Sequence, residues 1–190
     1  MGKALRRRLI DQGQQTRLID NHYVNNPIFG LLDLDGVRPL PAATWERVGE
    51  VRDAVIATIA TLSPKEWSFI FTNDLIDSPK ERQWVAVLES LATARSSAFM
   101  VVRLLCEPEE LCRRIASPER QAMMKSISTD WIKGRIATEQ VLDPQLPSTL
   151  TLDITSMAPD DAADRILAHR SGLADVSDQD PENDSLSLDP

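Results

Sequence analysis

The chain has 190 residues, of which 42% are hydrophobic and 26% are charged, and its formal net charge is -8. This length and composition suit one domain with a sizeable core, and no apolar run is long enough to span a membrane. The acidic balance argues against nucleic acid as a partner. Because the chain has neither a membrane span nor a signal-peptide core, we expect a cytoplasmic protein that does not associate with a membrane.

Apolar runs alternate with amphipathic stretches along the chain, which is typical of βαβ units with a parallel sheet covered by helices. We predict strands at 17–20, 67–72, 99–105 and 149–154, and helices at 2–11, 43–61, 79–94, 108–116, 129–138 and 159–169. Three of these helices begin with a proline that acidic residues follow, at Pro79, Pro108 and Pro159. The stretch 31–41, with one glycine and two prolines, predicts a loop.

The end of the chain differs from the rest in charge. Residues 171–190 contain six acidic residues and no lysine or arginine, so the remainder is nearly neutral. Low aromatic content and many Asp and Ser residues predict a disordered acidic tail at 171–190 after a domain at 1–170. Cys106 and Cys112 lack the spacing of a metal site, and we interpret both as packing residues.

Four segments follow one another in the same order as in a known superfamily, namely 17–29, 69–75, 101–115 and 149–155. The chain resembles P-loop NTPases, and within them the AAA-type, shikimate-kinase-like or chloramphenicol-phosphotransferase-like small-molecule kinases. The resemblance implies an α/β fold with three layers, in which helices flank a parallel sheet. It also implies ATP and Mg²⁺ as cofactors of the full-length family and a small molecule as phosphate acceptor.

The phosphate-binding loop of that family is not found in this sequence. Family members open with a strand and G-x-x-x-x-G-K-[ST], whose backbone N–H groups surround the phosphates. Here the first nine residues are typical of the helix that follows the loop, and Ala4 stands after Gly2 and Lys3 where a hydroxyl is required. The family's strand order, 2-3-1-4-5, makes the first strand the central one. We therefore expect that strand to be missing between 67–72 and 99–105.

Two explanations for the absent loop remain open. The natural protein is either an ATP-dependent kinase whose reading frame begins further upstream, or a non-catalytic binding or scaffold protein derived from the same fold. In both cases we expect this polypeptide to bind neither ATP nor Mg²⁺ and to be inactive as a kinase.

Candidate acceptor-side residues follow the first two predicted strands. Asp20 ends a short apolar strand, where open α/β sheets place ligand-binding groups, and the resemblance implies that it contacts the acceptor hydroxyl as a general base or orienting group. The alternative is a simple polar turn with Asn21.

Arg52 is either a pocket residue or a solvated helix residue. The other candidates for acceptor binding are His22, Asn25, Asn26, Thr72 and Asn73. Because the position that matches the family's metal-binding aspartate is Thr72, we predict no metal ligand on this strand.

Candidate phosphate-side residues lie in the second half of the chain. The basic set Arg113, Arg114, Arg120 and Lys125 resembles a lid, in which guanidinium groups bind phosphate oxygens and stabilise the transition state. We predict catalytic roles for Arg114 and Arg120, and a helix-surface pairing of Arg113 with Glu109 or Glu110. Asp153 and Thr155, which end the last strand, are predicted on the nucleotide side together with Arg114. We interpret the four tryptophans as core or interface residues: Trp45, Trp67, Trp84 and Trp131.

Overall fold

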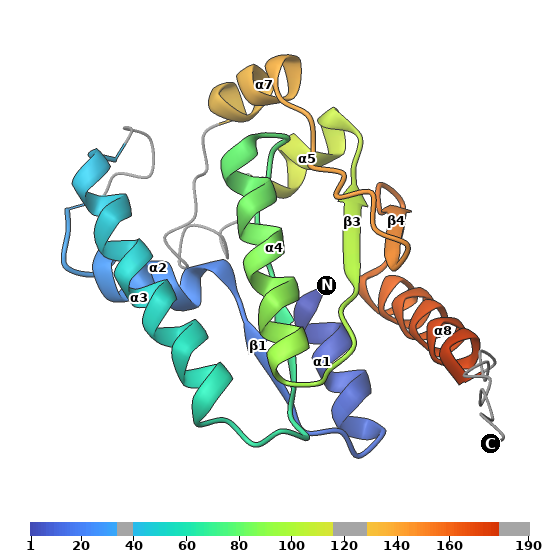
Figure 1. Ribbon diagram of the computed structural model, residues 1–190. Coiled ribbons are helices and arrows are strands. Elements are labelled where there is room, and N and C mark those ends of the chain that lie inside the picture. Colours follow the sequence, from blue (N-terminus) through green and yellow to red (C-terminus); the bar gives the residue numbers. More distant parts are fainter. Residues whose placement is uncertain (34–39, 116–128, 179–190) are drawn as a thin grey trace, which may run out of the picture.

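The computed structural model describes residues 1–33, 40–115 and 129–178, which form a mixed α/β structure (Figure 1). Helices and strands alternate for most of the chain, as the hydrophobic pattern predicts. In chain order the elements are α1 (Gly2–Asp11), β1 (Thr16–Ile19), α2 (Asn21–Phe29), α3 (Ala42–Thr61), β2 (Ser68–Phe71), α4 (Pro79–Ala94), β3 (Val101–Leu105), α5 (Pro108–Ile115), α7 (Thr129–Thr138), β4 (Thr149–Asp153) and α8 (Pro159–Asp178).

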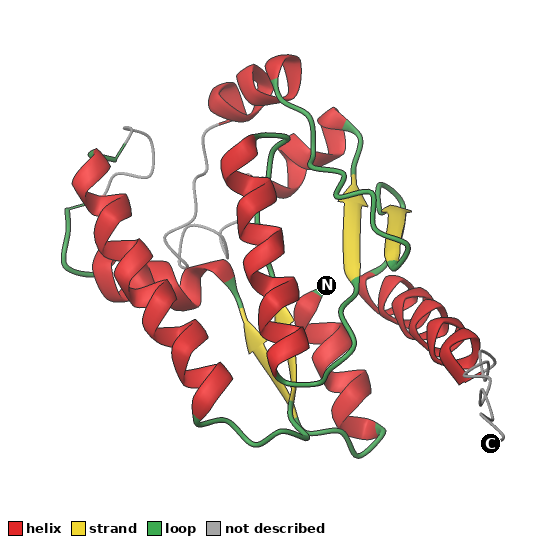
Figure 2. Cartoon of the chain, viewed as in Figure 1, coloured by secondary structure: helices red, strands yellow, loops and turns green. Residues whose placement is uncertain are grey.

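The strands form two separate parallel pairs (Figure 2). In the first pair, Thr16 of β1 lies opposite Ser68 of β2 and the register continues to the strand ends. In the second pair, Val101 of β3 lies opposite Thr149 of β4. Among the described strands, no ladder joins β2 to β3. The predicted parallel strands are therefore present, but as two sheets of two strands.

Helix α1 joins the two pairs through one hydrophobic core. Its buried residues Ala4, Leu5 and Leu9 pack against α8 and β4, where Ala162 and Ala163 are completely buried. Alanine at both α8 positions lets the two helices approach closely. Apolar side chains of β2, of β3 and of the residue before β3 pack against the same cluster, namely Ile70, Val102, Leu104 and Met100. Both sheets thus lie against a single helix layer.

Helix α4 lies on the opposite side of β2. Ile70 packs against the α1 core, whereas the neighbouring residue Phe69 lies under the guanidinium of Arg95, which follows α4. Successive side chains of a strand point to opposite faces, so α1 and α4 cover different faces of this sheet. Helix α4 begins with Pro79 in its first turn, as predicted, and the Ser78 hydroxyl caps it by accepting the Glu81 N–H.

Two helices differ from the prediction. Residues 21–29 form α2 although the three asparagines and Pro27 suggest a loop, because the Asp20 side chain caps the helix and outweighs those signals. Helix α8 continues to Asp178, although Ser171 and Gly172 suggest an end near His169. Residues 171–178 are consequently helical and not part of a disordered tail, and residues 179–190 lie outside the described part. None of the described helices has the length and hydropathy of a membrane span.

Candidate functional site

Asp20 occupies the junction between β1 and α2. Its backbone is extended, so it does not yet belong to the helix, and its Oδ1 accepts the backbone N–H of His22 at 3.0 Å. This contact makes Asp20 the N-cap of α2, where a carboxylate is also favoured by the partial positive charge of the helix end. The junction is therefore more than the simple polar turn that the sequence also allowed, because one carboxylate oxygen is committed to the helix cap.

The second oxygen of Asp20 faces the neighbouring strand. The Thr72 hydroxyl donates to Asp20 Oδ2 at 3.2 Å and accepts the Asn21 N–H at 3.2 Å. Thr72 directly follows β2, and its own N–H donates to the Ile19 carbonyl of β1. Parallel pairing of β1 with β2 thus brings the carboxyl ends of both strands together, which is where this class of sheet places ligands.

A small hollow opens beside this pair of residues. Its cavity volume is about 20 Å³, roughly the space of one water molecule, and its polar wall is formed by Asp20, Asn21, Arg52, Thr72 and Asn73. Its remaining wall is apolar and aromatic, formed by Ile19, Val24, Val55, Ile56, Phe71 and Trp84. A few convergent polar groups on an apolar surface are typical of small-molecule sites. The space is far smaller than the roughly 300–1,000 Å³ of such sites, so a small molecule would have to displace some of the surrounding side chains.

Arg52 and Trp84 form one side of the hollow. The guanidinium of Arg52 on α3 lies 4.7 Å from the ring centre of Trp84 on α4, and the indole N–H of Trp84 donates to Asn73 Oδ1 at 3.1 Å. The aromatic ring therefore holds both the arginine and the asparagine in position. The structure places Arg52 at the hollow, against the ring of Trp84.

Three of the predicted acceptor residues do not line this hollow. His22 and Asn26 lie one helical turn apart on α2, where His22 Nδ1 is 2.9 Å from Asn26 Oδ1, and the His22 ring meets Phe29 edge to face. Asn25 is only 5% exposed and belongs to the buried side of α2. These side chains build the helix that presents Asp20.

The predicted phosphate-side residues form a second polar cluster, at the carboxyl ends of β3 and β4. Arg114 donates to the carbonyls of Ile154 and Thr155, at 2.9 and 3.0 Å, and to Glu110 at 2.7 Å. The Thr155 hydroxyl accepts the Glu107 N–H, and Thr155 in turn donates its N–H to Asp153. Hydrogen bonds from Thr155, first its side chain and then its backbone, lower the pKa of Asp153. Arg114 is thus already occupied by groups of the chain itself.

Arg113 pairs with Glu110 through two bonds of 2.6 Å, three residues apart on α5, as expected for a surface pair. Arg120 and Lys125 lie outside the described residues, so the structure does not place the second predicted lid arginine. Among the described side chains, no group of three His, Cys, Asp or Glu residues is arranged to hold a metal ion.

Comparisons with known proteins bear on the fold. No known protein family and no curated protein sequence matches the chain. A protein of Chloroflexus aurantiacus J-10-fl, which is provisionally described as a kinase and whose crystal structure was solved at 1.70 Å, superposes with a TM-score of 0.59. The likeness covers 92% of this chain and 87% of that chain at 16% sequence identity. The two proteins share a fold. At this identity the likeness shows a kinase-like fold and nothing about activity.

Trp84 lines the hollow, although sequence reasoning did not include it among the candidate site residues. None of the four tryptophans is fully buried, and three of them lie under arginine guanidinium groups: Trp67 under Arg17, Trp84 under Arg52 and Trp131 under Arg135. The arginine partners come from other elements or other turns of a helix, so the linear sequence contains no basic stripe next to a tryptophan. The contact of Arg52 with Trp84 at the hollow forms because α3 packs against α4.

Proposed function

We propose that residues 1–190 form the acceptor-binding part of an ATP-dependent small-molecule phosphotransferase of the P-loop superfamily. The observation that carries the proposal is the contact between Asp20 and Thr72, which presents a carboxylate beside a hollow at the carboxyl ends of two parallel strands. The kinase-like fold of the Chloroflexus aurantiacus protein supports the same reaction class. The proposal includes a three-layer arrangement with a further strand in the centre of the sheet.

In this proposal Asp20 accepts a hydrogen bond from the acceptor hydroxyl and orients its oxygen. Phosphoryl transfer depends mainly on positioning and charge neutralisation, and the cap and the Thr72 bond hold the carboxylate in place before an acceptor arrives. Arg52 and Asn73 supply hydrogen-bond donors and acceptors for the remaining oxygens of the bound phosphate acceptor. The ring of Trp84 and the apolar wall exclude water from the hollow.

The described residues do not fit a nucleotide. The sequence contains no G-x-x-x-x-G-K-[ST], and Ala4, which follows Gly2 and Lys3, is 7% exposed and packed in the α1 core. A magnesium-binding hydroxyl cannot be replaced by a buried methyl group. ATP and Mg²⁺ are therefore proposed for a longer form of the protein, and this polypeptide alone is proposed to be inactive.

The absent phosphate loop also favours a second function, a non-catalytic binding protein that keeps the Asp20 hollow and has no nucleotide site. The two candidates differ when a strand and a G-x-x-x-x-G-K-[ST] loop are placed ahead of Met1. A phosphotransferase then consumes Mg·ATP in the presence of its acceptor. A binding protein stays folded, binds the same molecule and transfers nothing.

Acceptor binding itself can be tested with the 190-residue chain. We expect one class within a panel of sugars, hydroxy acids, nucleosides and hydroxylated antibiotics to shift the backbone NMR signals of Asn21, Thr72 and Asn73. Asp20→Asn preserves the helix cap and removes the charge, and it should weaken this binding by roughly 10- to 100-fold. Asp11→Asn, an exposed carboxylate at the end of α1, is the matched control and should bind as the wild type does.

A further inference from the structure

Two arginines meet at the edge of β1 that lies away from β2. Arg6 Nε on α1 donates to the Thr16 carbonyl at 3.2 Å, and Arg17 Nη1 donates to the same oxygen at 3.4 Å. The Ser68 N–H of β2 donates to the Gln15 carbonyl, and the backbone groups of the next residue point to the other side of the strand. Two guanidinium groups therefore lie together beside the outward-facing carbonyl of Thr16.

The two side chains reach this point from opposite faces of the sheet. Arg6 belongs to α1, which packs on the face that Ile70 occupies. Arg17 is the ladder partner of Phe69, so its side chain leaves the strand on the other face. There the Arg17 guanidinium lies over the ring of Trp67, 3.9 Å from the ring centre. The contact with the ring orients the guanidinium plane and leaves the N–H groups at its rim for other partners.

Neither arginine has a carboxylate partner in the part of the chain that the structure describes. Arg7, the next residue of α1, forms an ion pair with Asp160 of α8. Arg6 and Arg17, by contrast, make hydrogen bonds to a backbone carbonyl only. Glu66, which precedes Trp67, is exposed and forms no ion pair with a described residue. The two positive charges are therefore not balanced by a neighbouring side chain.

A third guanidinium group contacts the same tryptophan. Arg95 is 4% exposed, donates to the Trp67 carbonyl at 3.3 Å and lies 5.0 Å from the ring centre of Phe69. Its other described hydrogen-bond partners are also backbone carbonyls. Like charges that are close together repel one another, and an anion beside them removes this cost. This end of the sheet is thus locally positive although the chain has a net charge of -8.

We propose that Arg6 and Arg17 bind a phosphate group at the edge of β1, either as inorganic phosphate or as the phosphate of a monoester. Guanidinium groups bind phosphate oxygens through pairs of N–H groups. Each guanidinium has N–H groups on three nitrogens, and here one nitrogen of each is used by the Thr16 carbonyl. A carboxylate offers two oxygens and suits one such pair. A phosphate dianion has the oxygens and the charge for both arginines.

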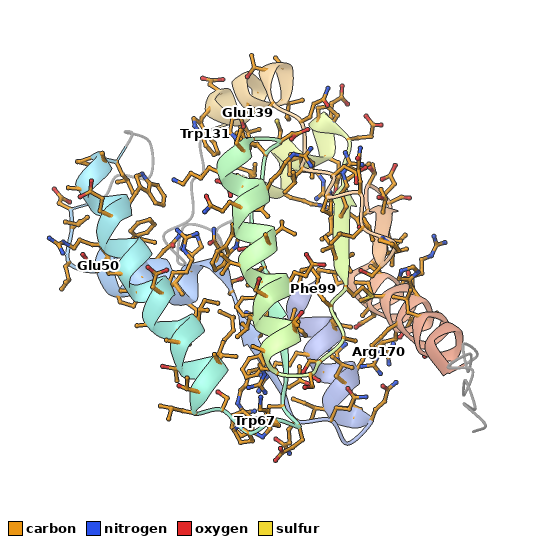
Figure 3. All side chains as sticks on the ribbon, in the orientation of Figure 1. Glu50, Trp67, Phe99, Trp131, Glu139 and Arg170 are labelled. Carbon is orange, nitrogen blue, oxygen red and sulfur yellow. The ribbon has the colours of Figure 1, made fainter. Side chains whose placement is uncertain are left out.

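This phosphate site is separate from the hollow at Asp20. Thr16 begins β1 and Asp20 follows its last residue, so the two positions are about 13 Å apart along the strand. Figure 3 shows Trp67 at the end of the molecule away from Trp131 and Glu139. The site therefore lies beyond the reach of a molecule bound at Asp20, and it does not depend on the proposed function.

Titration of the 190-residue chain with inorganic phosphate at constant ionic strength tests the proposal. We expect the NMR signals of the Trp67 indole N–H and the Arg17 Nε–H to shift and to saturate, with a dissociation constant below about 1 mM. Glycerol phosphate, a monoester, identifies the source of the group. Tighter binding than that of inorganic phosphate indicates a phosphorylated small molecule, and otherwise the free ion is the ligand. Acetate should bind at least about tenfold more weakly than inorganic phosphate.

Substitutions on α1 separate a built site from a general attraction of anions. Arg6→Gln should weaken phosphate binding at least about tenfold, and because Arg6 is exposed the fold should remain intact. Arg6→Lys keeps the charge but not the paired N–H groups, and should restore only part of the binding. The matched control is Arg7→Gln, which removes the same charge one residue further along and should bind as the wild type does.

Three results would overturn the proposal. Shifts that grow linearly with phosphate up to about 20 mM would show that no site exists. Equal weakening by Arg6→Gln and Arg7→Gln would show that net charge alone attracts the anion. Shifts of Thr72 and Asn73 in place of Trp67 would show that phosphate binds at the hollow instead.

Discussion

Arg95 is a buried arginine that holds the turn between α3 and β2. It is 4% exposed and donates to five backbone carbonyls, and its guanidinium lies 5.0 Å from the ring centre of Phe69. The carbonyls belong to the end of α3 and to the residues that lead into β2, namely Ile59, Ser63, Pro64, Lys65 and Trp67. One side chain thus satisfies acceptors that no helix or sheet bond reaches.

We predict that Arg95→Ala lowers the free energy of unfolding by about 3 kcal/mol, because buried carbonyls lose charge-assisted hydrogen bonds. Arg47→Ala is the matched control. Its side chain is 66% exposed and pairs with Glu50 on the surface, so its removal should change stability by less than about 0.5 kcal/mol. Urea unfolding of the three proteins measures both effects. Similar values for the two variants would contradict the role given to Arg95.

Glu110 on α5 makes stability depend on pH in the acid range. Hydrogen bonds from Arg113 and then Arg114 lower its pKa from 4.5 to about 2. The contribution of this carboxylate is therefore complete above the unfolded-state value and is lost as the pH falls from 4.5 towards 2. We predict that Glu110→Gln flattens the fall of the urea midpoint in this window, whereas Glu109→Gln on the same helix does not. Identical slopes in all three proteins would contradict this prediction.

Helix α7 is attached to the rim of the candidate site by one residue. Arg135 donates to both oxygens of Asp74, at 2.6 and 3.4 Å, and to Glu139, and it lies over the ring of Trp131. Asp74 directly follows Asn73 of the hollow. Figure 3 shows Trp131 and Glu139 near α7, far from Trp67 at the other end of the molecule. Backbone pairing of residues 75–77 with 140–142 continues this attachment.

Loss of the Arg135 contact should loosen this attachment without unfolding the domain. We predict that Arg135→Gln speeds hydrogen exchange of the Leu142 and Asp77 amides about fivefold, equivalent to about 1 kcal/mol, because the bond to Asp74 is partly exposed and only moderately strong. Lys133→Gln, an exposed neighbour on α7, should leave these amides unchanged. Unchanged exchange in Arg135→Gln would show that backbone pairing alone holds the helix.

The elements themselves were largely predictable from local patterns. Proline and acidic residues fixed the starts of α4, α5 and α8, and apolar runs located all four strands to within two residues. The sequence could not reveal α2, because its cap depends on one Asp20 oxygen and its asparagines and Pro27 favour a loop. Nor could it reveal the length of α8, because Ser171 and Gly172 are typical of a helix end.

The candidate site was predictable only in part, because several of its contacts depend on how elements that are distant in the chain pack against one another. Asp20, Thr72 and Asn73 were found because carboxyl ends of parallel strands meet at one edge. Trp84 depends on the packing of α3 against α4, and the bonds of Arg114 depend on β4, so neither follows from spacing along the chain. The role of the lid residues Arg120 and Lys125 stays a prediction.

At the scale of the whole molecule, the polar residues form two clusters on the same side of two parallel sheets. Asp20, Thr72 and Arg52 line the hollow beside β1 and β2, while Arg114, Asp153 and Thr155 lie beside β3 and β4. Between them are the unpaired edges of β2 and β3.

The most direct test of the central claim is acceptor mapping by backbone NMR on the 190-residue chain, with Asp20→Asn and Asp11→Asn measured alongside. The proposal predicts that one class of hydroxylated small molecule shifts the signals of Asn21, Thr72 and Asn73, and that Asp20→Asn alone abolishes most of the binding. If no class shifts these signals, or if Asp20→Asn binds as tightly as the wild type, the hollow at Asp20 is not an acceptor site.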